Sequence, residues 1–224
     1  MRRLSKPRAI AACVALFLAP CAHAESFFQA EVGLGIAQGL DSGDGQWVQY
    51  GVPHSEHLTT PIYTVGFTGA LWDHGNWSSH YHLDYVYMGE QSAQCDCVAD
   101  AQYNPQTHTA APGAQQTAFS GHGHTQGVLL AADFGYTWRG TRFALEGGPF
   151  VFVPSWHETV YTAPPTVVSH TPILQLSYEL GARVERGPWS LAFRFFRTPS
   201  AWDPYPALVG KTYTLSLMYR HNVF

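Results

Sequence analysis

Charged residues are scarce in this chain: Asp, Glu, Lys and Arg make up 12% of its 224 residues, whereas 46% are hydrophobic. This fraction is low for a soluble domain, in which about a quarter of all residues are usually charged. Long hydrophobic runs are missing as well, since no segment after residue 24 offers about 18 uninterrupted apolar residues. These two absences exclude a helical membrane protein and indicate that something other than water faces much of the surface.

Basic residues are scarce, and a third of them lie in the first 24 residues. Residues 1–24 combine a basic start, an apolar stretch at 9–18 and Ala-His-Ala before Glu25, which is typical of a cleaved secretory signal peptide. We therefore expect residues 25–224 to form the single mature domain. Cleavage removes four of the 12 basic residues and none of the 16 acidic ones, which leaves a net charge of −8. Such a charge disfavours nucleic acid as a partner.

Cysteine is nearly absent from the mature chain. Only Cys95 and Cys97 remain after cleavage, and export to an oxidising compartment permits a disulfide between them. Cys21 raises the alternative of lipid attachment, but Pro20 before it fits the lipoprotein pattern poorly.

What the chain does have is strict alternation. In eight segments one face is apolar and carries no Asp, Glu, Lys or Arg, and a period of two places each set on one side of a strand. The apolar sets are Phe28, Ala30, Val32, Leu34 and Ile36; Tyr63, Val65, Phe67, Gly69 and Leu71; Trp77, Ser79, Tyr81, Leu83, Tyr85 and Tyr87; Val128, Leu130, Ala132, Phe134, Tyr136 and Trp138; Phe143, Leu145, Gly147, Pro149, Val151 and Val153; Leu174, Leu176, Tyr178, Leu180, Ala182 and Val184; Trp189, Leu191, Phe193 and Phe195; and Tyr213, Leu215, Leu217 and Tyr219. The sequence therefore predicts an all-β fold, an eight-stranded antiparallel up-and-down transmembrane β-barrel.

The connections between these segments alternate in length, as hairpins do when one end faces the periplasm and the other the cell exterior. The short connections are 73–76, 139–141 and 185–188, and the long ones are 37–59, 89–124, 154–171 and 198–210. Both termini should then be periplasmic.

Aromatic residues gather near both ends of the segments, as in the girdles that lie at headgroup depth. The girdle residues are Trp72, Trp77, Trp138 and Trp189 beside the short turns, and Tyr63, Tyr85, Tyr87 and Tyr213 toward the long loops.

The opposite face of the segments carries the charge. Because eight strands leave a lumen only wide enough for side chains, we expect opposite charges there to pair in a polar interior rather than to line a diffusion pore. The predicted network consists of Glu31, His80, His82, Asp84, Asp133, Arg142, Glu146, Glu179, Arg183, Arg194 and Arg220.

On these patterns the mature chain resembles the small eight-stranded outer-membrane proteins of the OmpA/OmpX type. The resemblance implies residence in the outer membrane of a Gram-negative bacterium, in contact with its lipid. The final residues, up to Phe224, look like the C-terminal signal that the outer-membrane assembly machinery recognises. Asn222 stands where that pattern usually has an aromatic residue, and Phe224 is out of phase with Tyr219.

Some eight-stranded barrels are enzymes, and the lipid A deacylases rely on a His-x-Ser pair with an acidic residue on the outer barrel surface. A serine hydroxyl needs such a neighbouring base to become nucleophilic. This chain has no His-x-Ser; residues 54–56 (His-Ser-Glu) and 169–170 (Ser-His) hold the right types, but adjacent strand residues point to opposite faces. Lipid A acyl hydrolysis is therefore an alternative, without assigned catalytic residues.

The long loops offer two further possibilities. Cys95, Cys97, His122 and His124 could form a disulfide or bind zinc or copper, with His54 and His57 as further ligands. On the third segment, His80, His82 and Asp84 share a face and could also hold a metal. We expect no bound cofactor, and we expect the loops, including the mostly uncharged stretch from Ala99, to mediate adhesion, shielding or recognition of an extracellular ligand.

A secreted lipocalin-like barrel that binds a small apolar ligand is a second alternative. Its outer face should be polar, which the uncharged outward sets argue against. The sequence thus favours a non-enzymatic integral envelope protein.

Overall fold

The computed structural model describes residues 28–40, 54–98, 102–104, 107, 109–170, 173–198 and 210–223. Its strands are β1 (Gln29–Gly39), β2 (His54–His57), β3 (Thr59–His74), β4 (Trp77–Cys97), β5 (Tyr103–Asn104), β6 (Thr109–Ala110), β7 (Thr117–Trp138), β8 (Thr141–Val160), β9 (Thr166–His170), β10 (Gln175–Arg186), β11 (Trp189–Arg197) and β12 (Lys211–Asn222). Among the described residues no helix is long and apolar enough to cross a bilayer.

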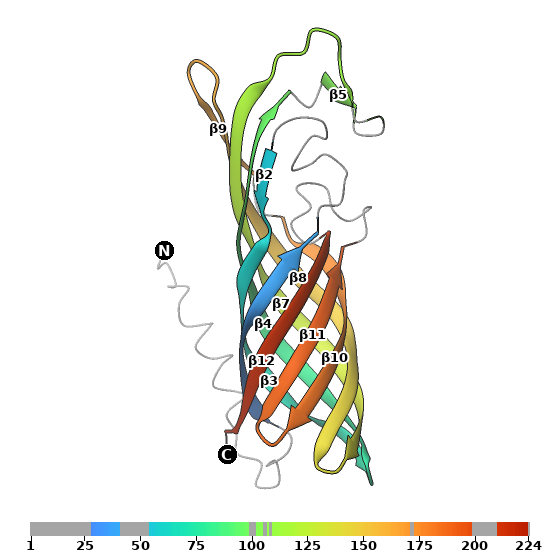
Figure 1. Ribbon diagram of the computed structural model, residues 1–224. Coiled ribbons are helices and arrows are strands. Elements are labelled where there is room, and N and C mark those ends of the chain that lie inside the picture. The colour runs from blue at the N-terminus through green and yellow to red at the C-terminus, as the bar shows by residue number, and fades with distance from the viewer. Residues whose placement is uncertain are drawn as a thin grey trace, which may run out of the picture.

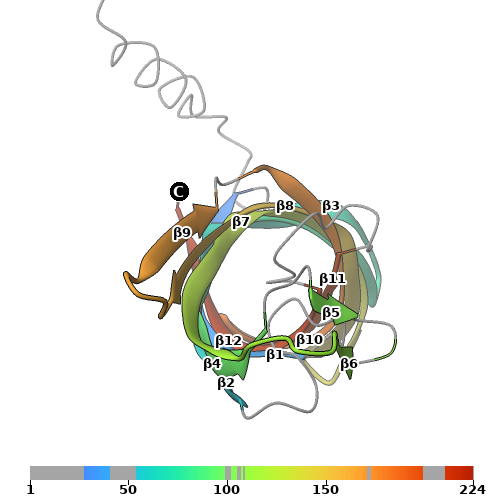
Figure 2. The same ribbon diagram turned by 90° about the horizontal axis from the view of Figure 1, so that it is seen from above.

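Eight of these strands close into a barrel (Figures 1 and 2). β1, β3, β4, β7, β8, β10, β11 and β12 each pair antiparallel with the next, and β12 returns to β1 in a register that runs from Gln29 opposite Asn222 to Gly39 opposite Thr212. Closure satisfies the backbone groups that a sheet edge would leave unpaired, which a membrane span requires. The predicted eight-stranded barrel is confirmed.

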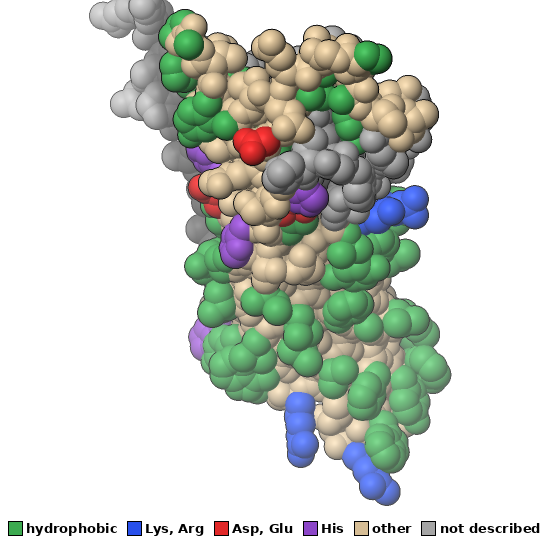
Figure 3. Space-filling view, turned by 45° about the horizontal axis from the view of Figure 1, so that its top comes forward, with side chains coloured by type: hydrophobic (Ala, Val, Ile, Leu, Met, Phe, Trp, Pro, Cys, Tyr) green, Lys and Arg blue, Asp and Glu red, His purple; other side chains and the backbone are tan. Residues whose placement is uncertain are grey.

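The outer surface of the barrel is a band of apolar side chains. Leu34, Leu145 and Leu180 expose 59%, 72% and 59% of their surface, and the other large apolar residues of the predicted sets are exposed or half-buried. Hydrophobic side chains cover the lower part of the face seen in Figure 3, with Lys and Arg at its lower rim. Because a soluble monomer rarely exposes so continuous an apolar surface, this band is the lipid-facing surface of a transmembrane barrel.

The three predicted short connections are tight turns at one end of the barrel. The turn between β7 and β8 consists of Arg139 and Gly140, whose φ angles are 49° and 77°. Two successive residues with positive φ are typical of the two-residue type I′ turn, whose twist matches that of the flanking strands. β1 begins and β12 ends at this same end, because Gln29 lies opposite Asn222.

The interior has two layers, which corrects the expectation of a polar lumen throughout. Toward the short turns it holds the charged residues, but above them lies a buried apolar cluster. Phe150 packs on Phe152 and Phe196 with ring centroids 5.3 and 5.1 Å apart. The inward positions of β8 are apolar at this level, so residues 150–153 are hydrophobic on both faces, whereas the buried Ser177 of β10 and Thr212 of β12 lie opposite Phe150 and Phe196. This layer lies in the lumen above the charged residues.

Two of the predicted long loops are largely strand, which is a second correction. β4 and β7 stay paired as far as Cys97 opposite Thr117, and β7 and β8 as far as Phe119 opposite Val160. β2 adds to β4, and β9 adds to β8. Together residues 54–57, 90–97, 117–124, 154–160 and 166–170 form a sheet, the projecting sheet, that rises beyond the barrel (Figure 1).

A β-bulge marks the start of the projecting sheet on β4. The register shifts between Tyr87 and Glu90, and Gly89 has a φ of 69° that side-chain-bearing residues rarely adopt. Outward positions on β4 are therefore odd-numbered below the bulge and even-numbered above it. Glu90 faces outward, whereas Cys95 faces the interior side and is buried.

Candidate functional site

The buried charges of the lumen form one ion-pair network, and Arg183 is its centre. Arg183 Nη1 donates to Glu31 Oε2 at 2.7 Å, and Arg183 Nε donates to Glu146 Oε2 at 3.1 Å. Arg194 contacts the other oxygen of Glu146 at 2.8 Å and Asp84 Oδ2 at 3.0 Å. These ion pairs therefore connect β1, β4, β8, β10 and β11 across the lumen.

A second group of the network surrounds Asp133. Arg142 donates to both of its carboxylate oxygens, at 2.5 and 2.9 Å, and His82 Nε2 lies 3.0 Å from Asp133 Oδ2. Arg142 and Arg220 also donate to Glu185, at 3.3 and 3.1 Å. Gly135 leaves the space for Arg142, because a Cβ there would lie 2.8 Å from the guanidinium carbon.

Glu179 differs from the other predicted members. It is 1% exposed, and neither of its oxygens has a hydrogen-bond partner among the described residues. The structure therefore places all eleven predicted residues on the lumenal side, and it pairs ten of them. Glu185, at the first position of the predicted short connection 185–188, is an additional member of the network.

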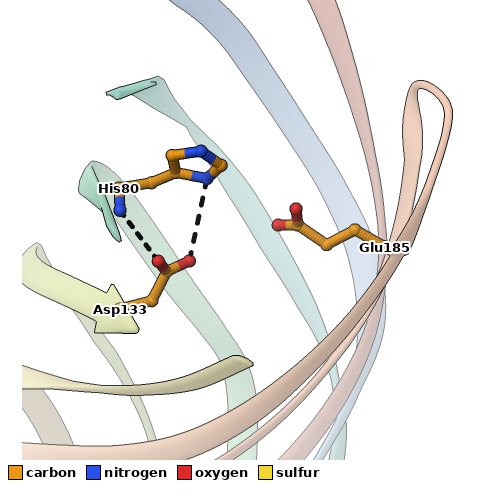
Figure 4. A group of neighbouring side chains, drawn as sticks. All are labelled: His80, Asp133 and Glu185. Carbon is orange, nitrogen blue, oxygen red and sulfur yellow. Dashed lines mark hydrogen bonds and ion pairs between the residues drawn. The ribbon is translucent and has the colours of Figure 1, made fainter. Parts of the chain in front are cut away.

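His80, Asp133 and Glu185 come closest to a metal site inside the barrel (Figure 4). Their possible ligand atoms lie within 4.8 Å of one another, beside a cavity of about 350 Å³ at the short-turn end. Asp133, however, already accepts four hydrogen bonds, from the His80 amide, His82 and twice from Arg142. A carboxylate has about four lone-pair sites, so a metal would have to displace Arg142. The arrangement therefore favours an ion-pair cluster.

The three residues that share a face on β4 do not converge either. His82 turns to Asp133 and lies 3.6 Å from Glu31, whereas Asp84 pairs with Arg194. The metal alternative suggested by His80, His82 and Asp84 is not supported by this geometry.

The outer face of the projecting sheet presents a second group of side chains. Strand register places Ser92, His122, His157 and Ser169 side by side on β4, β7, β8 and β9, with His57 of β2 opposite Ser92. The rings of His122 and His157 have centroids 5.6 Å apart, and His157 Nδ1 lies 2.9 Å from Ser169 Oγ.

A shorter row lies one step nearer the barrel. Here Glu90 of β4 is opposite His124, and His124 is opposite Ser155 of β8. The His124 ring packs on Tyr87 with centroids 5.5 Å apart. These rows are just beyond the aromatic residues of the long-loop end.

The four residues considered for a loop disulfide or metal site lie on opposite faces of the sheet. Cys95 and Cys97 are joined by a disulfide on the interior side, whereas His122 and His124 point outward. His54 lies opposite Cys95, and His57 is on the outward row. The structure thus places the Cys95–Cys97 pair and the His122–His124 pair on different faces of the sheet. The residue that it brings next to His122 is His157.

The serine–histidine candidates also change partners. Ser55 and Glu56 are consecutive residues of β2 and face opposite sides, so residues 54–56 do not form a triad. Ser169 contacts His157 rather than its neighbour in sequence. His157 was missed because it is separated from these residues by more than ten positions, and only strand register brings them together.

The predicted girdle residues lie on the outer surface of the barrel. All eight are exposed except Tyr87, which is half-buried. Near the short turns, Trp77 stacks on Phe134 and Trp189 packs on Tyr219, with ring centroids 5.1 and 4.9 Å apart. Phe224, the predicted assembly signal, and residues 1–24 lie outside the described residues.

No protein-family model and no curated protein sequence matches the chain. Among solved structures it is similar to the outer membrane enzyme PagL, with 10% identity and a TM-score of 0.39 over 86% of this chain and 97% of that one. It is also similar to Ail, the attachment invasion locus protein of Yersinia pestis, solved with the heparin analogue sucrose octasulfate; identity is 10% and the TM-score 0.43, over 87% and 99% of the two chains. The fold assignment rests on the strand pairing of this chain.

Proposed function

We propose that the protein is a non-enzymatic integral outer-membrane barrel that presents the projecting sheet outside the cell as a recognition surface for adhesion or partner binding. In this proposal the signal peptide is removed before Glu25, and the outer-membrane assembly machinery inserts the mature domain. The observation that carries the proposal is that β4, β7 and β8 continue as a hydrogen-bonded sheet well past the lipid-facing band.

The shape of the molecule favours recognition over transport. The apolar layer around Phe150 and the ion pairs around Arg183 both occupy the lumen. By contrast, the projecting sheet is held rigidly by strand pairing, and rigid scaffolds that display polar surface are the usual place for binding. Among the described strands β2 and β9 each pair on one side only, and such edges can accept a strand from a partner.

The test removes the parts of β4 and β7 that belong to the projecting sheet and leaves the barrel strands unchanged. Residues 90–124 are replaced by Asn-Gly, a favoured two-residue hairpin turn, in a Gram-negative host that lacks the protein. Cells with the full chain should adhere to an epithelial monolayer or to one another, and the shortened variant should return to the level of the empty host.

A matched control replaces residues 199–209, in another predicted extracellular connection, by the same turn. This variant should keep the activity of the full chain. Both variants should remain heat-modifiable bands in the outer-membrane fraction. A full chain that promotes no more adhesion or aggregation than the empty host would contradict the proposal.

Lipid A acyl hydrolysis remains a second candidate because one observation favours it. His157 and Ser169 are hydrogen-bonded at 2.9 Å on the outward face, as a nucleophile and its base require. Among the described residues, no carboxylate is hydrogen-bonded to His157 to orient it. The hydrolase predicts loss of an acyl chain from the lipid A of expressing cells, and the Ser169→Ala variant should restore the original mass. An unchanged lipid A spectrum with the wild-type chain removes this candidate.

A further inference from the structure

We propose that the outer face of the projecting sheet carries a binding site for a divalent transition-metal ion of the zinc or copper type, with His122, His124 and His157 as ligands. His122 and His124 are two residues apart on β7 and therefore share a face. His157 on β8 lies directly opposite His122. Three imidazoles thus occupy neighbouring positions on one side of two paired strands.

The spacing of the first two rings suits a shared metal. Zinc binds imidazole nitrogen at about 2.0–2.1 Å, which places the ion about 3.2 Å from each ring centroid. Tetrahedral coordination then sets the two centroids about 5 Å apart. The rings of His122 and His157 are 5.6 Å apart, at an interplanar angle of 34°. The pair is thus within about 1 Å of the separation that a shared ion needs, and side-chain rotation has to bring one nitrogen of each ring onto it.

His124 supplies the third ligand from the next row. It is diagonal to His157, and such neighbours on an antiparallel pair are about 7–8 Å apart at the backbone, within reach of long side chains. Its ring now packs on Tyr87, and rotation away from that ring directs it toward the other two histidines. Three histidines with one open position are the donor set of catalytic zinc sites, and imidazole also suits copper and nickel.

Neighbouring polar groups can orient the ligands, as metal-bound histidines require. His157 Nδ1 is held by Ser169 Oγ at 2.9 Å, which leaves its Nε2 available to a metal. Glu90 lies opposite His124, and Ser92 lies opposite His122. Each histidine therefore has a hydroxyl or carboxylate neighbour on the strand beside it.

The electrostatic setting also favours a cation. Glu90 and Asp96 lie on the same outward face as the three histidines, and the projecting sheet contains no Lys or Arg. This is the opposite of the lumenal cluster, where Arg142 already occupies Asp133. His122 and His157 are exposed, so a metal can reach them without opening the barrel.

The test uses the full mature chain without a histidine tag, folded in detergent with its disulfide intact. Calorimetric titration with Zn²⁺ should show one site, and Co²⁺ should give the visible absorption of a metal bound by protein nitrogens. His122→Ala and His157→Ala should each weaken Zn²⁺ binding by at least about tenfold, and His124→Ala should weaken it as well. Ser169→Ala should keep the site but lower its affinity by about tenfold, as loss of an orienting partner does.

Two controls make the result specific. His74→Ala and His221→Ala remove exposed histidines at the opposite end of the barrel and should bind like the wild type, and heat modifiability shows that each variant is folded. Wild-type binding by all three ligand variants, or no Zn²⁺ binding by the wild-type chain, overturns the proposal. Binding that is lost in His80→Ala but kept in His157→Ala also overturns it, because the metal then lies in the lumen.

Discussion

Replacing Arg183 by Met should destabilise the barrel strongly, because it removes the central cation of the lumenal ion-pair network. Arg183 is 1% exposed and donates to Glu31 at 2.7 Å and to Glu146 at 3.1 Å. Methionine fills similar space without charge, so the two carboxylates lose this partner inside a closed lumen. Removing one partner of a buried ion pair costs about 3–5 kcal/mol, since the other charge stays uncompensated.

The two carboxylates should not contribute equally to this loss. Glu146 keeps its contact with Arg194 at 2.8 Å, whereas the only charged partner left to Glu31 among the described residues is His82 at 3.6 Å. Most of the cost should therefore come from Glu31. The double variant Glu31→Gln with Arg183→Met removes that charge and should recover at least half of the loss.

Reversible unfolding in urea, followed by tryptophan fluorescence of protein folded into lipid vesicles, measures these free energies. The control is Arg186→Met, the same substitution three residues further along β10 at an exposed position, which should change stability by about 0.5 kcal/mol or less. A loss below about 1 kcal/mol for Arg183→Met, or an equal loss for Arg186→Met, would refute the argument that the network supports the barrel.

Three further predictions follow from the same structure. Leu130→Arg on the lipid face should cost about 2–4 kcal/mol of folding free energy in vesicles. Gln126→Arg, on the same face near the membrane boundary, should cost about 1 kcal/mol or less. Equal costs for the two variants would contradict the assigned lipid-facing band. Phe150→Ala should cost about 3–5 kcal/mol in urea unfolding because it empties part of the apolar layer, and a negligible change would place that ring outside the core. Mass spectrometry of the protein extracted from outer membranes should give a chain that begins at Glu25, and an uncleaved mass would exclude processing at this position.

The barrel was predictable because its two faces meet different surroundings. Positions such as Leu34 and Leu145 face lipid, while Glu31 and Glu146 face a crowded polar interior, so the sequence alternates sharply there. The short turns were also predictable from the sequence. Arg139-Gly140, for example, contains a glycine and lies where one alternating apolar segment ends and the next begins. The apolar layer was less visible: at residues 150–153 both faces are hydrophobic, and alternation alone cannot separate inside from outside.

Beyond the membrane this contrast between faces disappears, and the sequence signal with it. Residues 90–97 still alternate between outward and inward positions. However, the outward Glu90 and Ser92 and the inward Gln91 and Cys95 are all polar or small, so the segment has the composition of a loop. Register is also weakly specified by pattern where neither face is strongly apolar. The contact of His157 with His122 and Ser169 depends entirely on that register, over separations of 35 and 12 residues. In this chain the alternation pattern therefore predicts the structure of the membrane-spanning segments but not that of the projecting sheet. The surface with the greatest freedom to take on a binding role is the part whose arrangement has to come from the structure.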